Sequence, residues 1–379
     1  MNSAWNRTAP PPCPAGNRRI VGMFRELMRR LPVFLVCGVA VFVTSCRRNP
    51  ADTLLEAFPA AVSLSPVDSV LLEENYSVFS PEGVVVRGDR MVVLHTDGDA
   101  VLSLIGPDGR TPVFRKGRGP KELLDPTSLI QDGDRLKLYD GMSLMYFSAE
   151  MDALGTDGFR VDTLVRIRNA GQDGYCTAKY VYSKGASFVA AGYQPGYWYS
   201  LIAPDGRILD GVEYVRFPGK EDFSVNENYV LHLNSYAALH PDGDRGVCVM
   251  SGAAVISLFE IRGNALQEYC RKVFSSPQVE GSRDPGLPVL RHLPESTRAF
   301  QAVAADEKHI YALYSGGRVV QGVRPAEECT HLLVLDWSGE AVRHYELEAC
   351  INAFHVEDGC VWGVSKYPGS RLYVYQLDQ

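Results

Sequence analysis

One short phrase recurs along this chain and constrains its fold more than any other feature. It consists of a turn with glycine or an acidic residue, a basic or polar residue, and then four or five residues with alternating apolar side chains. A period of two is typical of a short, half-buried β-strand, and glycine allows the tight turn before it. Successive copies start 45 to 63 residues apart, close to the period of propeller blades with loop insertions, so the sequence predicts an all-β, six-bladed β-propeller. The six copies are at residues 88–94, 133–138, 184–189, 243–249, 306–313 and 358–363.

A second phrase supports the repeat. Residues 104–110 and 201–207 match at six of seven positions and lie 97 residues apart, which is about two periods. Both contain Pro-Asp-Gly, in which proline presets φ and glycine takes a positive φ, so each is a turn between two strands. We therefore expect each unit to continue beyond its first hairpin.

The two ends of the repeat predict how the ring closes. The first unit supplies four strands, near residues 83–87, 90–95, 100–105 and 110–115, and the last supplies three, near 353–356, 360–364 and 372–377. Residues 67–73, VDSVLLE, precede the first unit and have the composition of the missing strand. We predict that this N-terminal strand pairs with residues 370–378 and joins the last blade, which would cover both open edges.

The N-terminal segment reads as a secretory signal peptide over residues 1–45. Arg25, Arg29 and Arg30 precede an apolar run over residues 31–43, which is too short to span a bilayer. The proline-rich residues before Met23 would make the signal overlong, so we expect translation to start at Met23 or Met28.

The residues that follow the apolar run, Val43-Thr44-Ser45-Cys46, resemble the lipobox of bacterial lipoproteins. The resemblance implies a diacylglyceryl thioether on Cys46 and a further acyl chain such as palmitate on the new amino terminus. Several acyl chains anchor a protein stably to a membrane. The alternative is a core cysteine after a buried helix. We expect residues 46–66 to form a lipidated tether and residues 67–379 to form the propeller domain.

The residues after Cys46 bear on localisation. Arg47 is not the aspartate associated with retention in the inner membrane, and no acidic export tract follows it. By analogy with lipoprotein sorting, we expect the domain to be anchored to the outer membrane of a bacterial cell envelope and to face the periplasm.

Charge and motif content exclude several function classes. The net charge is −7, and six of the basic side chains lie within residues 1–45, so nucleic acid is not an expected partner. The cysteines beyond Cys46 form no CxxC pair, and no HExxH, Walker or G-x-S-x-G motif is present. We expect no cofactor and no metal, and no catalytic residue can be named; the pairing of the later cysteines stays open.

Three further phrases resemble those of a known family. Residues 117–122, GRGPKE, are similar to a G-x-G-P-x-E phrase of the TolB-like six-bladed β-propeller lipoproteins of Bacteroidetes, and residues 310–316 and 333–339 resemble phrases of their late blades. The resemblance covers about residues 83–379. It implies a fold and a cell-envelope location, and it carries over no catalytic residue.

Two groups of residues are candidate binding sites. A glycine-rich loop carries Arg115, Lys116, Arg118, Lys121 and Glu122, which could contact an anion or carboxylate. The alternative is a structural loop whose charges are solvated. The second group is the hairpin at residues 192–200, in which Tyr197 and Trp198 could form a stacking platform for a sugar or peptide, or could pack between blades.

Long insertions are a third source of candidates, since long loops in compact domains are often functional. They are residues 217–228, residues 275–298 with Arg291 and His292, and residues 317–330. We expect the second to overhang the channel. The acidic pairs around turn glycines, including Asp132/Asp134 and Asp242/Asp244, are explained by turn chemistry or could be calcium ligands.

Together these features favour a binding protein over an enzyme. We expect a cell-envelope lipoprotein whose propeller binds a protein, peptide or glycan partner through its channel face and loops. The alternative is a metal-dependent, lactonase-like hydrolase with a site at the channel mouth, although fold analogy alone is a weak reason for it. Three or more carboxylates and amides at the channel mouth would favour the enzyme.

Overall fold

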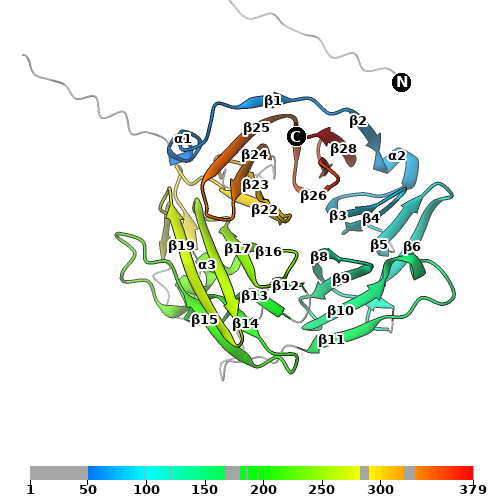
Figure 1. Cartoon of the computed structure of the whole chain (residues 1–379), viewed down its shortest axis with the longest axis horizontal. Helices are drawn as coiled ribbons and strands as arrows, with labels where there is room; N and C mark the ends of the chain where they lie inside the picture. Colours follow the sequence, from blue (N-terminus) through cyan, green and yellow to red (C-terminus); the bar gives the residue numbers. More distant parts are fainter. Residues whose placement is uncertain are drawn as a thin grey trace, which may run out of the picture. The chain divides into compact units, whose positions relative to one another are not determined.

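The computed structural model describes residues 50–98, 100–119, 121–166, 180–184, 187–194, 196–281, 290–319 and 329–378. All of these residues belong to one compact unit, Arg48–Gln379. Within this described part of the chain, six sheets of four or five strands are arranged around a central channel (Figure 1). The prediction of an all-β, six-bladed propeller is confirmed.

In each blade the strands follow one another in sequence from the channel outward (Figure 1). The first blade contains β3 (Pro81–Arg87), β4 (Arg90–His95), β5 (Ala100–Gly106), β6 (Gly109–Lys116) and the short β7 (Glu122–Leu123). The second contains β8 (Pro126–Asp132), β9 (Arg135–Asp140), β10 (Met145–Glu150) and β11 (Asp162–Arg166), with the 3-10 turn η2 (Met151–Ala153) before β11. The third contains β12 (Tyr180–Lys184), β13 (Ser187–Gln194), β14 (Tyr197–Ile202) and β15 (Ile208–Glu213).

The second half of the ring repeats this order. The fourth blade contains β16 (Ser235–Leu239), β17 (Arg245–Met250), β18 (Val255–Arg262) and β19 (Ala265–Val273). The fifth contains β22 (Phe300–Ala305), β23 (His309–Tyr314), β24 (Cys329–Asp336) and β25 (Ala341–Ile351). The sixth contains β26 (Ala353–Glu357), β27 (Cys360–Ser365) and β28 (Arg371–Gln376).

The recurring phrase forms the second strand of the inner hairpin of each blade and, wherever the structure describes it, the turn before that strand. In the first two blades its glycines, Gly88 and Gly133, both have a φ of 59°, a left-handed conformation that glycine adopts without steric cost. Strand bounds in the first and last units agree with the predicted ranges to within two residues. Local turn chemistry therefore sets the blade boundaries.

The hydrophobic core is divided into six clusters, one between each pair of adjacent blades. Val92 of the first blade packs in one cluster with Leu136 of the second, and the series continues around the ring. The last cluster joins Val84 of the first blade to Val364 and Leu372 of the sixth. Because every blade buries both faces against neighbours, the ring is held together by apolar burial at each interface.

An N-terminal strand closes the ring as predicted. β2 (Asp68–Leu71) pairs antiparallel with β28 as the outer strand of the sixth blade. The strand is shorter than the predicted residues 67–73, because α2 (Leu72–Tyr76) begins at a fully buried Leu72. This short helix turns the chain from the rim of the sixth blade toward the inner strand of the first.

From Pro50 onward, the structure differs from the tether expected over residues 46–66. The helix α1 (Pro50–Leu55) is followed by β1 (Val62–Leu64), which pairs in parallel with β25 at the rim of the fifth blade (Figure 1). Leu54 is fully buried and Phe58 nearly so, in the cluster between the fourth and fifth blades. Burial of these apolar side chains makes the stretch part of the propeller surface. The signal peptide and Cys46 lie outside the described residues.

Two further observations concern helices and cysteines. No helix within the described ranges is long and apolar enough to cross a membrane. Five of the cysteines beyond Cys46 are described, and Cys248, Cys270 and Cys360 have free thiols. Cys248 and Cys329 are buried apolar-like residues within strands, and Cys176 lies outside the described residues.

Candidate functional site

A polar cavity of about 490 Å³ lies at one mouth of the channel. Its walls come from the inner strands of all six blades, near the residue at which each strand begins. Because the inner strands run side by side around the channel, their first residues meet at the same mouth. The lining residues with polar side chains are Glu82, Thr96, Asp125, Thr127, Ser128, Tyr180, Tyr182, Asn234, Tyr236, Ser251, Arg298, Gln301 and Asn352.

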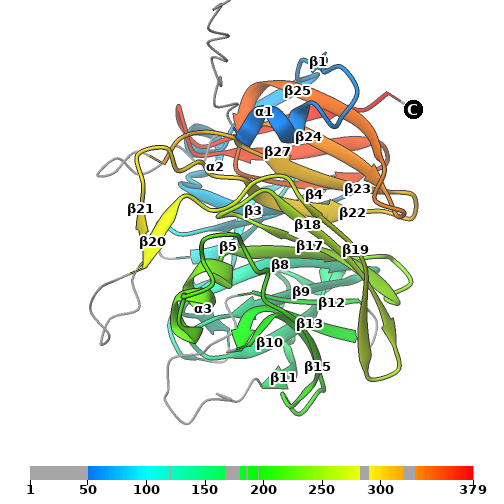
Figure 2. The same ribbon diagram turned by 90° about the vertical axis from the view of Figure 1, so that its left-hand side faces the viewer.

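The connections between blades lie on this same side of the ring. The helix α3 (Val225–Leu233) connects the third and fourth blades, and the hairpin of β20 (Val279–Gly281) and β21 (Leu290–His292) connects the fourth and fifth. Figure 2 shows α3 and this hairpin on one side of the ring. Ser224 and Glu227 form a capping box that fixes the start of α3.

Carboxylates and amides are concentrated at the cavity. Glu82 accepts a hydrogen bond from Lys366 Nζ at 2.6 Å, and Gln301 Nε2 donates to Ser251 Oγ at 3.3 Å. Asn352 Nδ2 donates to the Pro81 carbonyl at 2.9 Å and so ties the sixth blade to the first. The other side-chain atom, Asn352 Oδ1, is buried and has no hydrogen-bond partner among the described residues.

Three tyrosines form one wall of the cavity. The ring of Tyr180 lies 6.3 Å from that of Tyr182 and 5.1 Å from that of Tyr236, measured between centroids. Burial raises the pKa of Tyr180 and of Tyr182 well above the ordinary value. Both phenols therefore stay protonated and can each donate and accept hydrogen bonds.

A smaller pocket of about 130 Å³ adjoins the cavity. The two spaces share Asn234, Ser251 and Arg298, and the smaller one is also lined by Val279, Leu290 and His292 of the β20–β21 hairpin. Burial, and then the charge of Arg298, lower the pKa of His292. The insertion expected to overhang the channel thus supplies Arg298 to the cavity and His292 to its extension.

The glycine-rich loop lies elsewhere. Arg115 and Lys116 end the outer strand β6 with exposed side chains, and Lys121 Nζ lies 4.9 Å from the ring centroid of Phe159. Glu122 accepts a hydrogen bond from the Gly119 backbone at 2.8 Å, which braces the loop.

Arg118 of this loop lines a depression at the rim between the first and second blades, together with Arg166. The structure does not bring any of the loop's five candidate residues to the channel cavity.

The two aromatic candidates have different surroundings. Trp198 is fully buried, and its Nε1 donates to Ser235 Oγ at 2.8 Å. It is a core residue that packs between the third and fourth blades, so its interpretation as a stacking platform is wrong. Tyr197 is half-buried, and its ring lies against Gly211, where a Cβ would be only 2.5 Å away.

The last two candidates lie on the β20–β21 hairpin. Arg291 forms an ion pair with Glu280 across the hairpin, and both side chains are exposed. His292 lines the smaller pocket as described above. Of the nine candidates for binding, only His292 lies at the channel mouth.

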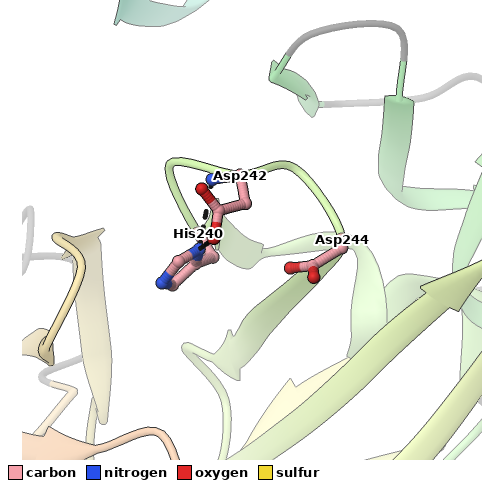
Figure 3. A group of neighbouring side chains, drawn as sticks. All are labelled: His240, Asp242 and Asp244. Atoms are coloured by element: carbon pink, nitrogen blue, oxygen red, sulfur yellow. Dashed lines mark hydrogen bonds and ion pairs between the residues drawn. The ribbon is translucent and has the colours of Figure 1, made fainter.

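A possible metal centre occurs at the opposite end of the inner strand β16. His240, Asp242 and Asp244 have ligand atoms within 4.8 Å of one another (Figure 3). However, His240 Nδ1 accepts the backbone N–H of Asp242 at 3.1 Å, and Arg245 Nη2 lies 3.0 Å from Nε2. Both imidazole nitrogens are thus occupied, and a guanidinium would repel a cation. Turn chemistry, one of the two alternatives for this acidic pair, accounts for the cluster.

The residues that form the cavity were not recognised in the sequence, apart from the general expectation of a channel-mouth site. Asp125, Asn234 and Asn352 each immediately precede an inner strand, and Glu82 is the second residue of β3. A polar residue at the start of each inner strand is the signal that could have found them.

Fold and site together define a six-bladed propeller with a polar cavity at one mouth of its channel. The model of the family described as TolB-like 6-blade propeller-like matches residues 65–359, and the chain belongs to this family. No curated protein matches the sequence.

The solved structures that resemble this chain share little sequence with it. A gluconolactonase from Xanthomonas campestris is 13% identical, with 84% of this chain and 99% of that chain covered and a TM-score of 0.48. BamB from Moraxella catarrhalis is 8% identical, with 78% and 71% covered and a TM-score of 0.38. The propeller domain of Swd1 from Myceliophteria thermophila is 12% identical, with 83% and 99% covered and a TM-score of 0.43. At such low similarity, none of the three says what this chain binds or does.

Proposed function

We propose that this protein is a cell-envelope lipoprotein whose propeller binds a protein, peptide or glycan partner at the channel mouth. The observation that carries the proposal is the polar cavity to which all six inner strands contribute. Its volume of about 490 Å³ lies in the range of roughly 300–1,000 Å³ that is usual for ligand sites.

The chemistry of the cavity supports binding. Side chains that can both donate and accept hydrogen bonds line it, among them Thr96, Ser251 and Asn234. The phenol groups of the tyrosine wall combine apolar ring surface with a polar hydroxyl, as is common in recognition sites.

Anchoring at the membrane is the second part of the proposal. Lipidation of Cys46 would hold the propeller at the outer membrane, facing the periplasm, where it could meet an envelope partner. The residues that motivate this part are the arginines, the apolar run and the lipobox-like phrase of the N-terminal segment.

Site-specific crosslinking tests the binding site. A photoreactive amino acid replaces Thr96, which is exposed and lines the cavity, or Asp108, which is exposed in the β5–β6 turn at the other end of the blade. We expect illumination of whole cells to give a crosslinked product from position 96 and not from position 108. Equal capture at both positions, or none at either, would contradict the proposal.

A metal-dependent, lactonase-like hydrolase is the second candidate, because the cavity does contain the expected cluster. Glu82, Asp125, Asn234, Gln301 and Asn352 all line it, and carboxylate and amide oxygens are the ligands that calcium takes. A calcium ion held there would polarise a substrate carbonyl. The ion pair of Glu82 with Lys366 and the presence of Arg298 oppose cation binding.

Elemental analysis of the protein purified without chelator separates the two candidates. One calcium per chain, lost in a Glu82→Gln variant together with esterase or lactonase activity, would establish the hydrolase. A metal-free protein that still gives the position-96 crosslink would exclude it.

A further inference from the structure

The charges around the channel cavity are balanced. Two carboxylates, Glu82 and Asp125, line it. Lys366 is paired with Glu82 at 2.6 Å, and Arg298 also lines the cavity. A ligand with a net charge would leave one sign uncompensated in a partly desolvated site, which is unfavourable. The site therefore fits a neutral ligand, and a free peptide terminus, which carries a full charge, fits it less well.

The uncharged polar groups match a ligand with many hydroxyls. Thr96, Ser251 and the protonated tyrosines can each donate and accept, and the amides Asn234 and Gln301 can do both through separate atoms. A ligand hydroxyl can donate to one of these groups while accepting from its neighbour, which an aliphatic or aromatic hydrocarbon cannot do.

The tyrosine wall offers apolar surface beside these groups. Tyr180, Tyr182 and Tyr236 line one side of the cavity. The ring centroid of Tyr180 lies 6.3 Å from that of Tyr182 and 5.1 Å from that of Tyr236. A sugar ring has the matching combination, since its C–H face packs on an aromatic ring while its hydroxyls point to polar groups at the edge.

The adjoining pocket indicates a chain rather than a single sugar. It shares Asn234, Ser251 and Arg298 with the cavity and extends to His292 and Leu290 on the β20–β21 hairpin. A ligand that fills the cavity and continues past the three shared residues reaches this hairpin.

We propose that the ligand is a neutral glycan, whose terminal sugar occupies the channel cavity and whose next sugar lies against His292 in the adjoining pocket. This inference rests on the proposed binding function and specifies its ligand class. It assigns a role in ligand binding to the β20–β21 hairpin, an insertion between the fourth and fifth blades.

The first experiment measures binding of the full chain, purified in detergent, to a printed array of neutral and acidic glycans. We expect neutral glycans to bind, and a free disaccharide from the best binder to bind at least tenfold more tightly than its terminal monosaccharide. Selective binding of acidic glycans would overturn the inference.

Three variants localise the two sugars. His292→Ala should remove the tenfold advantage of the disaccharide and leave monosaccharide binding unchanged. Tyr236→Phe, which keeps the ring and removes the hydroxyl, should weaken both about tenfold. Arg291→Ala is the matched control, because Arg291 neighbours His292 but lines neither pocket. Equal effects of His292→Ala and Arg291→Ala would exclude the second subsite, and a melting curve of each variant verifies folding.

The second experiment separates failure of this inference from failure of the binding function. The product captured from position 96 is analysed for sugar composition. A captured partner that contains neutral sugar at the crosslink supports the glycan, whereas a captured partner without sugar refutes the glycan and leaves the binding function intact. If nothing is captured and no glycan binds, both proposals fail.

Discussion

His232 is a buried side chain that links α3 to the third blade. It lies in α3 and is fully buried; its Nδ1 lies 2.7 Å from the Asn228 carbonyl, and Val215 N donates to its Nε2 at 3.1 Å. With Nε2 accepting, Nδ1 carries the proton and donates to Asn228, so the imidazole is neutral. Burial lowers the pKa of His232 to about 4.

This arrangement predicts a loss of stability in mild acid. The unfolded chain takes up a proton near pH 6.5 and the folded chain only near pH 4, so the stability contributed by His232 is present above pH 6.5 and is lost as the pH falls toward 4. Between pH 7 and pH 5 we expect the free energy of unfolding to fall by about 2 kcal/mol from this residue. Burial also lowers the pKa of His355 to about 4, which adds to the effect.

Urea denaturation at the two pH values checks this prediction. A His232→Gln variant, whose amide oxygen can still accept from Val215, should be less stable at pH 7 but should lose less stability on acidification. An unchanged difference between pH 7 and pH 5 in this variant would show that His232 does not titrate as argued.

Trp198 gives a second prediction at the scale of residues. Trp198→Phe removes the hydrogen bond to Ser235 and leaves a small cavity between blades, so we expect a loss of roughly 2 kcal/mol in the free energy of unfolding. Crosslinking at position 96 should not change. Tyr197→Phe is the control, and we expect it to change the free energy of unfolding by no more than about 0.5 kcal/mol. If Trp198→Phe remains folded but loses the position-96 crosslink, Trp198 takes part in binding.

At the scale of elements, the N-terminal stretch is a structural part of the ring. α1 packs on the interface of the fourth and fifth blades, β1 extends the fifth blade and β2 completes the sixth (Figure 1). Each of these elements covers an edge or an apolar surface that the repeats leave open. The contacts of α1 and β1 thus add to the pairing of β2 in holding the N-terminal stretch on the ring.

Leu54→Ala tests the role of α1. Because Leu54 is fully buried, we expect the variant to lose about 2–5 kcal/mol in the free energy of unfolding, as other buried leucines do. Thr53→Ala, at an exposed neighbouring position, should change it by no more than about 0.5 kcal/mol. If residues 50–64 were a free tether, chemical denaturation would not distinguish the two variants.

At the scale of the whole molecule, the connections between blades lie on one side of the ring and the turns of the inner hairpins lie on the other. α3 and the β20–β21 hairpin share the side of the cavity (Figure 2). The inner hairpin turns, such as that of His240, lie at the other end of the inner strands. In this arrangement the loops can vary without disturbing the interfaces between blades.

The anchoring proposal makes a prediction at this same scale. In cell fractionation, we expect the native chain in the membrane fraction and the Cys46→Ser chain in the soluble fraction, because acyl chains contribute about 0.8 kcal/mol for each buried methylene. Metabolic labelling with palmitate should mark the first and not the second. A Cys46→Ser chain that stays with the membrane would show that Cys46 is not the anchor.

The glycine-rich loop and the aromatic hairpin illustrate why most candidate residues of the sequence analysis do not line the channel cavity. Both are rich in the right chemistry, yet Glu122 is used to brace its own loop and Trp198 is used in the core. Composition shows what a side chain can do, but its orientation depends on blades that are distant in the sequence. His292 does lie beside the cavity, because a long insertion can reach the mouth from the rim.

The sequence by itself determined the blade number, the hairpin turns and the closing strand, because each depends on residues within a few positions of one another: a turn glycine, a period of two, one unpaired apolar segment. Only the tertiary structure decided the site. Glu82, Asp125, Asn234 and Asn352 come from four different blades, and no local pattern brings them together. They meet because six inner strands converge on one channel, and that convergence exists only once the ring has closed.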